Sequence, residues 1–286
     1  MLGLRYYTLT NLSGSEYFVN ELDTYLTNRL AQKLSAGNYD DSFLSQWHEW
    51  LDELPILGAA GLLNKYITRK RPVTFSEPES ITVEIYDSFA GRIPIVVFGN
   101  ASDFEAFIVN LVYRGERPSN ISQMGASFIF GRTQRFLTLS RKFYSNTQPE
   151  YLGLTPEEWR EKSMLIRREH ELTHYYTKTF YGSASNNLHD ELIADFMGMY
   201  SAFGRYDSKL FRHFMGLDGS EGRLSLYTSG LSPESQKAVA EIACECSDRL
   251  EAWQDSESFR KMDTPSRIDY LCQLGIQGII HGIPIH

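Results

Sequence analysis

The spacing of the hydrophobic residues changes along this chain, and each change predicts a different kind of element. Apolar residues recur at helical spacing between residues 15 and 33. Residues 41–65 predict two more helices, with a break near Pro55 and Gly58. The chain is therefore expected to open with a helical region over residues 1–76.

From residue 80 the apolar residues alternate with polar ones, as they do in a half-buried strand, so a small sheet is expected. Pro94 stands early in the second strand, which favours an edge strand or a strand start. Residues 102–112 predict a helix, and the last two strands flank a turn at residues 131–133 and predict a hairpin. The predicted strands cover residues 81–86, 93–98, 126–130 and 135–140.

Residues 155–158 read Thr-Pro-Glu-Glu and mark the start of a long helix. Threonine at the N-cap, proline at the first helical position and glutamate at the third form a capping box. The helix is expected to run to about Tyr181, where Gly182 can end it. Asn187 is placed to start the next helix after a short turn, which makes the two helices antiparallel neighbours.

The long helix carries His170-Glu171-Leu172-Thr173-His174, which reads H-E-x-x-H. Two histidines four positions apart lie on one face of a helix, so both imidazoles can reach a single metal ion. Glu171 points into the same space without being needed as a ligand. This arrangement is typical of a zinc site with an adjacent general base.

A catalytic zinc ion needs a third protein ligand, and the next predicted helix offers one. Glu191 and Asp195 are four positions apart and share a face, so Glu191 can approach the histidines. Asp195 is placed to accept the N–H of a ligand histidine. His189 and Asp190 are rival third ligands on other faces of this helix. Small residues that would let the two helices approach closely are Ala194, Gly198 and Ala202.

The sequences H-E-L-T-H and D-E-L-I-A-D together resemble the gluzincin branch of the zincin metallopeptidases, which includes thermolysin-like enzymes. The resemblance covers about residues 156–203, and it implies zinc as the cofactor. Asp190 stands where these families usually have asparagine, and the spacing between the two motifs is slightly shorter. The roles that the resemblance implies are ligands at His170, His174 and Glu191, a base at Glu171 and a supporting carboxylate at Asp195.

Of two other groups of zincins, one matches these motifs less well, and the other is not excluded by them. Metzincins need a glycine and a third histidine where this chain has Thr177 and Phe180. Shorter zincins of the ImmA/IrrE kind also pair H-E-x-x-H with a downstream glutamate, so they stay open as relatives. The family within the zincins is therefore not fixed by these motifs.

The order of elements predicts an α+β fold of the zincin kind. Zincins of the thermolysin type place a small twisted sheet on the H-E-x-x-H helix and a mainly helical lobe below it. We therefore expect one metallopeptidase domain over residues 77–286, with the sheet and active-site helix in 77–182 and the helical lobe in 183–286. Ser232 and Thr264, each followed by proline, are expected to start helices of that lobe.

Composition narrows the classes of function. The net charge of −8 argues against a nucleic-acid partner, which needs a basic face, so residues 69–71 (Arg-Lys-Arg) are expected to form a solvated loop. No apolar run is long enough to cross a membrane, and the first residues lack the features of a signal peptide, so a cytoplasmic location is expected. The cysteines, odd in number and expected to be buried thiols, are Cys244, Cys246 and Cys272.

The leading hypothesis is a zinc-dependent metallopeptidase that acts on a peptide or protein substrate. Glu171 would accept the proton of a metal-activated water and deliver it to the leaving amine. Residues 126–130 are the candidate edge strand for pairing with an extended substrate. The alternatives are a zincin scaffold with a structural metal that binds or regulates, and a helical interaction protein without metal. Candidate donors to the oxyanion are His189, Tyr200, His213 and His281.

Overall fold

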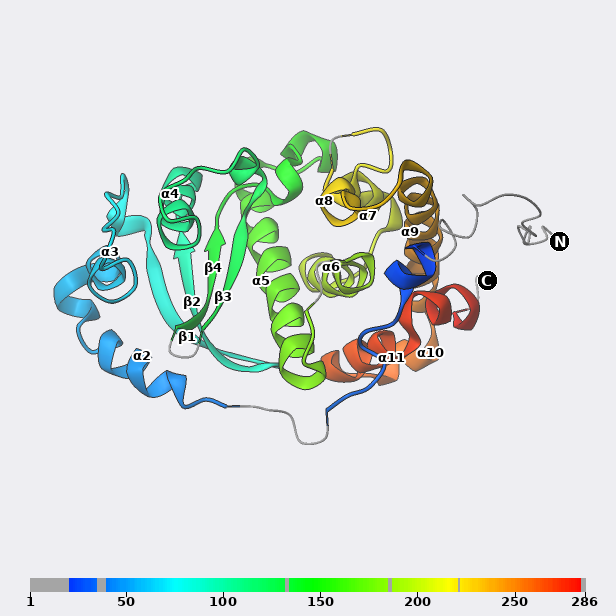
Figure 1. The fold of residues 1–286 in the computed structure, drawn as a ribbon, viewed down its shortest axis with the longest axis horizontal. Coiled ribbons are helices and arrows are strands. Elements are labelled where there is room, and N and C mark those ends of the chain that lie inside the picture. Colours follow the sequence, from blue (N-terminus) through cyan, green and yellow to red (C-terminus); the bar gives the residue numbers. More distant parts are fainter. Residues whose placement is uncertain (1–20, 35–39, 132–133, 185–186, 221, 284–286) are drawn as a thin grey trace.

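The described residues form an α+β fold, with one four-stranded sheet and helices before and after it in the chain (Figure 1). Residues 21–26 are helical, but the helix ends there, so the prediction that it continues to residue 33 is wrong. The part of this helix before residue 21 lies outside the described residues, as do the turn residues 132–133 and residues 185–186. The computed structural model describes residues 21–34, 40–131, 134–184, 187–220 and 222–283.

Residues 43–66 contain two helices, which confirms the prediction for residues 41–65. α2 (Phe43–Leu51) ends before α3 (Leu54–Tyr66) begins. Pro55 lies in the first turn of α3, where a missing N–H breaks no helical hydrogen bond. Gly58 has a φ of +65° and kinks α3, a conformation that glycine adopts without steric cost.

The sheet has the strand order β1-β2-β4-β3, so β1 and β3 are its edges. β2 pairs with β1 in the antiparallel sense and with β4 in the parallel sense, and β3 and β4 form the expected hairpin. A parallel pair needs a crossover, and the chain makes it through α4 (Ala101–Leu111). The strands are β1 (Thr82–Ser88), β2 (Gly91–Phe98), β3 (Ala126–Phe130) and β4 (Arg135–Ser140).

The prediction that Pro94 marks an edge strand or a strand start is wrong. β2 is a central strand, and Pro94 lies in its interior opposite Ile85 of β1. Pairing between β2 and β4 begins one residue later, at Ile95 opposite Leu137. The proline is tolerated in a central strand because it falls just beyond the end of the ladder with β4.

Each face of the sheet has its own hydrophobic core. Successive strand residues point to opposite faces, so Ile95 and Leu137 join one core while Val96 and Phe136 join the other. The outer core lies between the sheet and α2, α3 and α4, and the central core joins the sheet to α5, α6 and the C-terminal helices (Figure 1). The N-terminal helices thus pack on the sheet, and a domain boundary at residue 76 stays a prediction.

The two central helices have the expected caps. α5 (Pro156–Tyr181) begins with the capping box of Thr155 and Glu158, and it ends at Gly182, whose φ is +71°. α6 (Leu188–Phe203) begins at Asn187, whose side chain accepts the N–H of Asp190. The sequence therefore fixes both ends of α5 and the start of α6 locally.

The C-terminal region is helical as expected, with one correction. Ser232 caps its helix as predicted, but Thr264 is the first residue of its helix, and the cap is Asp263, which accepts the N–H of Ser266. Aspartate is as good an N-cap as threonine, and it stands one position earlier. The helices are α7 (Ser208–Met215), α8 (Leu224–Thr228), α9 (Pro233–Trp253), α10 (Glu257–Lys261) and α11 (Thr264–Gly282).

The cysteines and the helix lengths bear on two further expectations. The three cysteines are free thiols, of which Cys246 and Cys272 are buried and Cys244 is half-buried. No helix among the described residues has both the length and the apolar surface needed to cross a bilayer. Short 3₁₀ turns complete the fold at η1 (Pro78–Ser80), η2 (Ile121–Gln123), η3 (Tyr144–Asn146) and η4 (Pro149–Leu152).

Candidate metal centre

Two donors of the candidate centre lie on one face of α5. His170 and His174 are one helical turn apart, and their Nε2 atoms are 3.0 Å from each other. His170 is buried, whereas the side chain of His174 remains 15% exposed. The two imidazoles therefore face the same space, and that space can be reached from the surface on the His174 side.

Glu191 of α6 brings the third donor to the same space. Its carboxylate oxygens lie 3.5 Å from Nε2 of His170 and 3.4 Å from Nε2 of His174. Two ligand atoms of a tetrahedral zinc ion, each about 2.1 Å from the metal, are about 3.4 Å apart. The two separations between Glu191 and the imidazoles, which involve different oxygens of the carboxylate, are close to this value, and the separation of the two Nε2 atoms is shorter. Oε2 of Glu191 is buried and accepts no hydrogen bond within the described part of the chain, which leaves a lone pair for a cation.

A glycine allows α6 to bring Glu191 so close to α5. A Cβ on Gly198 would lie 2.6 Å from the carbonyl oxygen of Ile166, closer than any real Cβ contact. Ile166 lies one turn before His170 on α5, so this contact sets the separation of the two helices next to the donors. The prediction that small residues let the helices approach closely is confirmed at this position.

Asp195 lies behind His170 and holds its ring in place. Oδ1 of Asp195 lies 2.9 Å from Nδ1 of His170 and accepts the hydroxyl of Tyr144 at 2.6 Å. Nη2 of Arg223 donates to the other carboxylate oxygen at 2.6 Å. With its proton on Nδ1, His170 turns the lone pair of Nε2 towards the space shared by the three donors.

The electrostatics of the centre favour a bound positive charge. Burial raises the pKa of Asp195, but Arg223 and the hydrogen bond from His170 outweigh it and hold the pKa well below its usual value. Burial also raises the pKa of Glu191, but His174, His170 and Arg223 together outweigh it and hold the pKa below its usual value. Burial lowers the pKa of His174, yet Glu191 raises it to about 9. The space between the three donor side chains therefore favours a positive charge, which a proton or a metal ion would supply.

Glu171, the expected base, is half-buried beside the donors. Its negative charge acts on His174 and on Arg167, one turn earlier on α5. Arg167 is buried, and its guanidinium donates to carbonyl oxygens of residues 140–143 at 2.6–3.3 Å. These bonds attach the segment that leads to Tyr144 firmly to α5.

The rival third ligands point elsewhere. Nε2 of His189 lies 3.0 Å from the carbonyl oxygen of Leu271, and burial lowers the pKa of His189 to about 4. The ring is therefore neutral and donates its N–H to α11. Asp190 lies outside the three-donor group found among the described residues. Glu191 is thus the residue of α6 whose side chain joins the two histidines.

Two of the expected oxyanion donors pair with residues outside the donor group, although His213 also lines a pocket together with Arg223. Tyr200 packs edge-on against Phe259, and His213 lies 2.8 Å from a carboxylate oxygen of Asp218. His281 is exposed near the end of α11. These predictions thus receive no support from the geometry.

Three residues at the centre were missed by the sequence reasoning. Tyr144 is in η3, Arg223 directly precedes α8, and Tyr227 is in α8 with a hydrogen bond to Glu191. Nη1 of Arg223 is 3.9 Å from Oε2 of Glu191. None of the three lies in a periodic pattern or a spaced motif, so the sequence carried no local signal for them.

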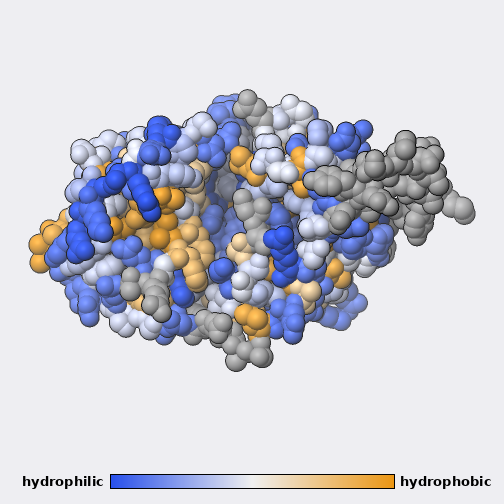
Figure 2. Space-filling model, viewed as in Figure 1, coloured by the Kyte–Doolittle hydropathy of each residue, from blue (hydrophilic) through white to orange (hydrophobic). Residues whose placement is uncertain are grey.

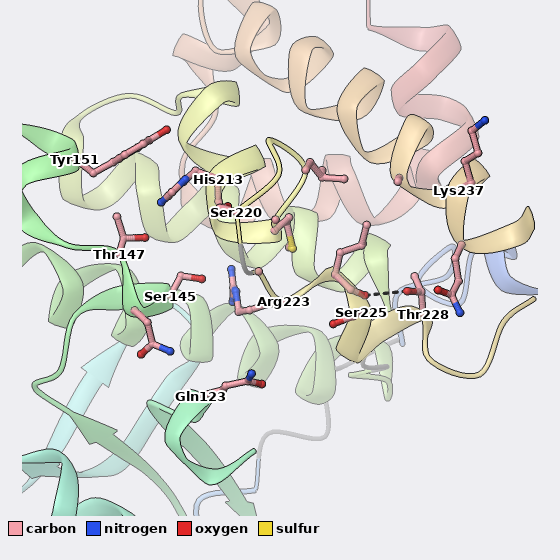
Figure 3. Close-up of a pocket in the computed structure, with 18 of the residues that line it drawn as sticks. Gln123, Ser145, Thr147, Tyr151, His213, Ser220, Arg223, Ser225, Thr228 and Lys237 are labelled. Atoms are coloured by element: carbon pink, nitrogen blue, oxygen red, sulfur yellow. Dashed lines mark hydrogen bonds between the residues drawn. The ribbon is translucent and has the colours of Figure 1, made fainter. Parts of the chain in front are cut away.

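A pocket of about 990 Å³ opens beside the centre, and Arg223 belongs to both (Figure 3). Ser145 and Asn146, which follow Tyr144, line it in left-handed conformations with φ of +52° and +56°. Such strain in residues other than glycine is often retained at binding sites. Figure 2 shows a hollow between the sheet half and the helical half of the molecule. Hydroxyl and amide groups in the pocket wall include Thr147, Ser220, Ser225, Thr228 and Gln236.

The fold and the site thus define an α+β protein with a buried His-His-Glu donor group supported by an aspartate. The chain belongs to the family described as "Family of unknown function (DUF7005)", which matches residues 57–135 and 132–281. The second match contains every residue of the candidate centre. No curated protein and no solved structure matched the chain in these comparisons.

Proposed function

We propose that this protein is a zinc-dependent metallopeptidase of the zincin kind. The single observation that carries the proposal is the geometry of the donors: His170, His174 and Glu191 each offer one ligand atom, and these atoms lie within 4.8 Å of one another, close enough to share one metal ion. Three protein ligands leave one position free, as in catalytic rather than structural zinc sites. A purely structural site would have no use for Glu171.

The residues around the centre suit peptide hydrolysis. A zinc ion held there would lower the pKa of a water molecule and polarise the carbonyl group of the scissile bond. Glu171 would accept the proton of the attacking water and donate it to the leaving nitrogen. Asp195 keeps His170 in the required tautomer, and Arg223 holds Asp195 ionised.

The edge strand β3 supports a peptide as the substrate. β3 is the edge of the sheet nearest to α5, and its free side has backbone groups that an extended peptide can pair with. Phe128 of β3 packs against Tyr175 of α5, which fixes the strand beside the helix that carries the donors. A sheet on this helix with a helical lobe beyond it is also the arrangement expected of a zincin. A cytoplasmic location stays a prediction.

Metal analysis and two substitutions test the proposal. Native protein should contain one zinc ion per chain by mass spectrometry of the purified, folded protein. Glu171→Gln should keep the zinc and lose hydrolysis of a peptide library, because only the base is changed. His174→Ala should lose the zinc, whereas the exposed control His281→Ala should keep it.

Two outcomes would overturn the proposal. Protein without stoichiometric metal after reconstitution with zinc would remove its basis. Zinc with a fourth protein ligand in the X-ray absorption spectrum would instead favour a structural metal in a binding or regulatory protein.

A further inference from the structure

A second pocket lies apart from the metal centre, at the C-terminal ends of α3 and α4 and beside the β3–β4 hairpin. Its volume is about 540 Å³, which is within the range of small-molecule sites. The run of residues 69–71, expected to be a solvated loop, lines this pocket. The fold adds Arg114 from the turn after α4, so four exposed cationic side chains line the pocket: Arg69, Lys70, Arg71 and Arg114.

The positive charge of this pocket is not compensated. No acidic residue is among the described residues that line it, and within the described chain none of its four cationic side chains has an ion-pair partner. Nearby cationic residues do have ion-pair partners: Lys65 pairs with Glu53, and Arg117 pairs with Glu105. In a chain of net charge −8, this concentration of unpaired positive charge indicates an anion as the missing partner.

The loop that carries residues 69–71 is held in place. The side chain of Asn64 on α3 donates to the carbonyl oxygen of Val73 at 2.9 Å and accepts its N–H at 2.8 Å. The hydroxyl of Thr68 donates to the same side chain at 2.7 Å. Asn64 therefore holds both ends of the loop, at Thr68 and at Val73. The three cationic residues of the loop lie between these two ends.

The turn after α4 is shaped to bring two of the arginines together. Arg114 has a φ of +57°, an unfavourable conformation for a side chain of this size. Gly115 has a φ of +96°, which favours glycine, and a Cβ there would lie 2.9 Å from Nη1 of Arg71, so this guanidinium lies against the turn. Cations after helix C-termini often cap carbonyl groups, but these guanidiniums donate no such bond within the described residues. Capping therefore does not explain the cluster.

We infer that this pocket binds a small phosphate-bearing anion with several negative charges, such as pyrophosphate or the polyphosphate group of a nucleotide. Guanidinium groups match phosphate oxygens in a bidentate fashion, and four cations exceed what a single carboxylate would neutralise. A nucleic acid fits less well, because it needs an extended basic face and the rest of this chain is acidic. The inference does not depend on the metal centre.

Calorimetric titration of the full chain with inorganic pyrophosphate tests the inference. Metal-free protein is used so that pyrophosphate cannot act by removing zinc. One binding event per chain is expected, and its affinity should fall as salt is added. Arg69→Glu and Arg114→Glu should each weaken binding by about tenfold or more, because each removes a charge-assisted hydrogen bond. The control Lys209→Glu makes the same charge change on α7 and should leave the affinity unchanged.

A further variant keeps the test valid if a glutamate variant folds poorly. Arg114→Gly relieves the left-handed strain, so it should keep or raise the melting temperature while it weakens pyrophosphate binding. ATP, orthophosphate and a short single-stranded DNA, titrated in parallel, distinguish the sources of the phosphate. Absence of pyrophosphate binding, or equal binding by wild type and all three variants, would overturn the inference. Tighter binding of the DNA than of pyrophosphate would replace it with a nucleic-acid site.

Discussion

The hydrophobic cores on the two faces of the sheet differ in the number of ionisable groups that they bury. The outer core is built from aromatic rings that pack edge to face, such as Phe107 against Phe136 and Trp47 against Trp50. Its one buried carboxylate nearby, within the described residues, is Asp103, which accepts backbone N–H groups of residues 76–77 and so has a structural task. The outer core therefore needs no explanation beyond stability.

The central core encloses ionisable groups that stability alone does not require. Arg167, His170, Glu191 and Asp195 are all at least 94% buried there. Burying charges costs free energy even when they are paired, and well-packed apolar residues would often be at least as stable. The contrast with the outer core is therefore consistent with the proposed metal centre, which would use the space that these groups enclose.

Truncation of an aromatic ring in the outer core should have the largest effect on stability. Phe107→Ala removes a fully buried ring and should lower the free energy of unfolding by about 3–5 kcal/mol, measured by urea denaturation. Zinc content per folded chain should not change, because Phe107 is on the opposite face from the donors. The half-exposed Phe130 is the control, and Phe130→Ala should cost much less. Loss of zinc in Phe107→Ala would contradict the separation of the two cores.

A methyl group between α5 and α6 should affect both stability and the centre. Gly198→Ala places a Cβ against the backbone of Ile166, so the helices must move apart, at a cost of about 1–3 kcal/mol. Zinc affinity, measured by competition with a chelating dye, should fall as well, because Glu191 moves with α6. Gly230→Ala adds the same group in open space and should change neither quantity. A Gly198→Ala protein that keeps full zinc affinity would show that the helix separation is not critical.

A rise in pH should lower the stability of the metal-free protein and raise its affinity for zinc. The pKa of His174 lies at about 9 in the metal-free fold, above the ordinary value of 6.5. Its contribution to stability is therefore fully present below pH 6.5 and is lost as the pH rises through 9. Zinc affinity should rise over the same range, because the metal displaces this proton. Thermal unfolding of chelator-treated protein measures the first effect, and in His174→Gln the pH dependence should be flatter.

Removal of the Tyr144 hydroxyl should give the smallest effect. Tyr144→Phe deletes one hydrogen bond to Asp195, and stability should fall by about 0.5–1.5 kcal/mol. Zinc should still bind, with an affinity about tenfold lower because His170 is held less firmly. Tyr151→Phe, which changes an exposed tyrosine, provides the comparison. Equal zinc affinity in the two variants would exclude Tyr144 as a positioning residue.

Features set by neighbouring residues could be read from the sequence. The capping box at Thr155 gives the start of α5, and the alternation around the hairpin gives the bounds of β3 and β4. Glu191 and Asp195 were found because helical periodicity places both on the face towards the histidines. In each case the physical cause lies within about four residues of the predicted feature.

Features set by distant residues could not be read in this way. Tyr144 and Arg223 reach Asp195 across 51 and 28 positions of the sequence, and neither stands in a pattern. The central position of β2 depends on its parallel pairing with β4, which the proline at position 94 did not reveal. Residues 69–71 form an exposed loop as predicted, but only the fold shows that Arg114 lines the same pocket.

The bonds of Asp195 bear on the order in which a newly made chain can become functional. A chain released from the ribosome only as far as α6 already contains His170, His174 and Glu191, but it lacks Arg223. Without that guanidinium, burying Asp195 would leave a negative charge poorly compensated, so α5 and α6 have reason to stay apart until later residues arrive. Under the proposed function, assembly of the centre would thereby be coupled to completion of the lobe beyond it, and capture of metal during synthesis would be disfavoured.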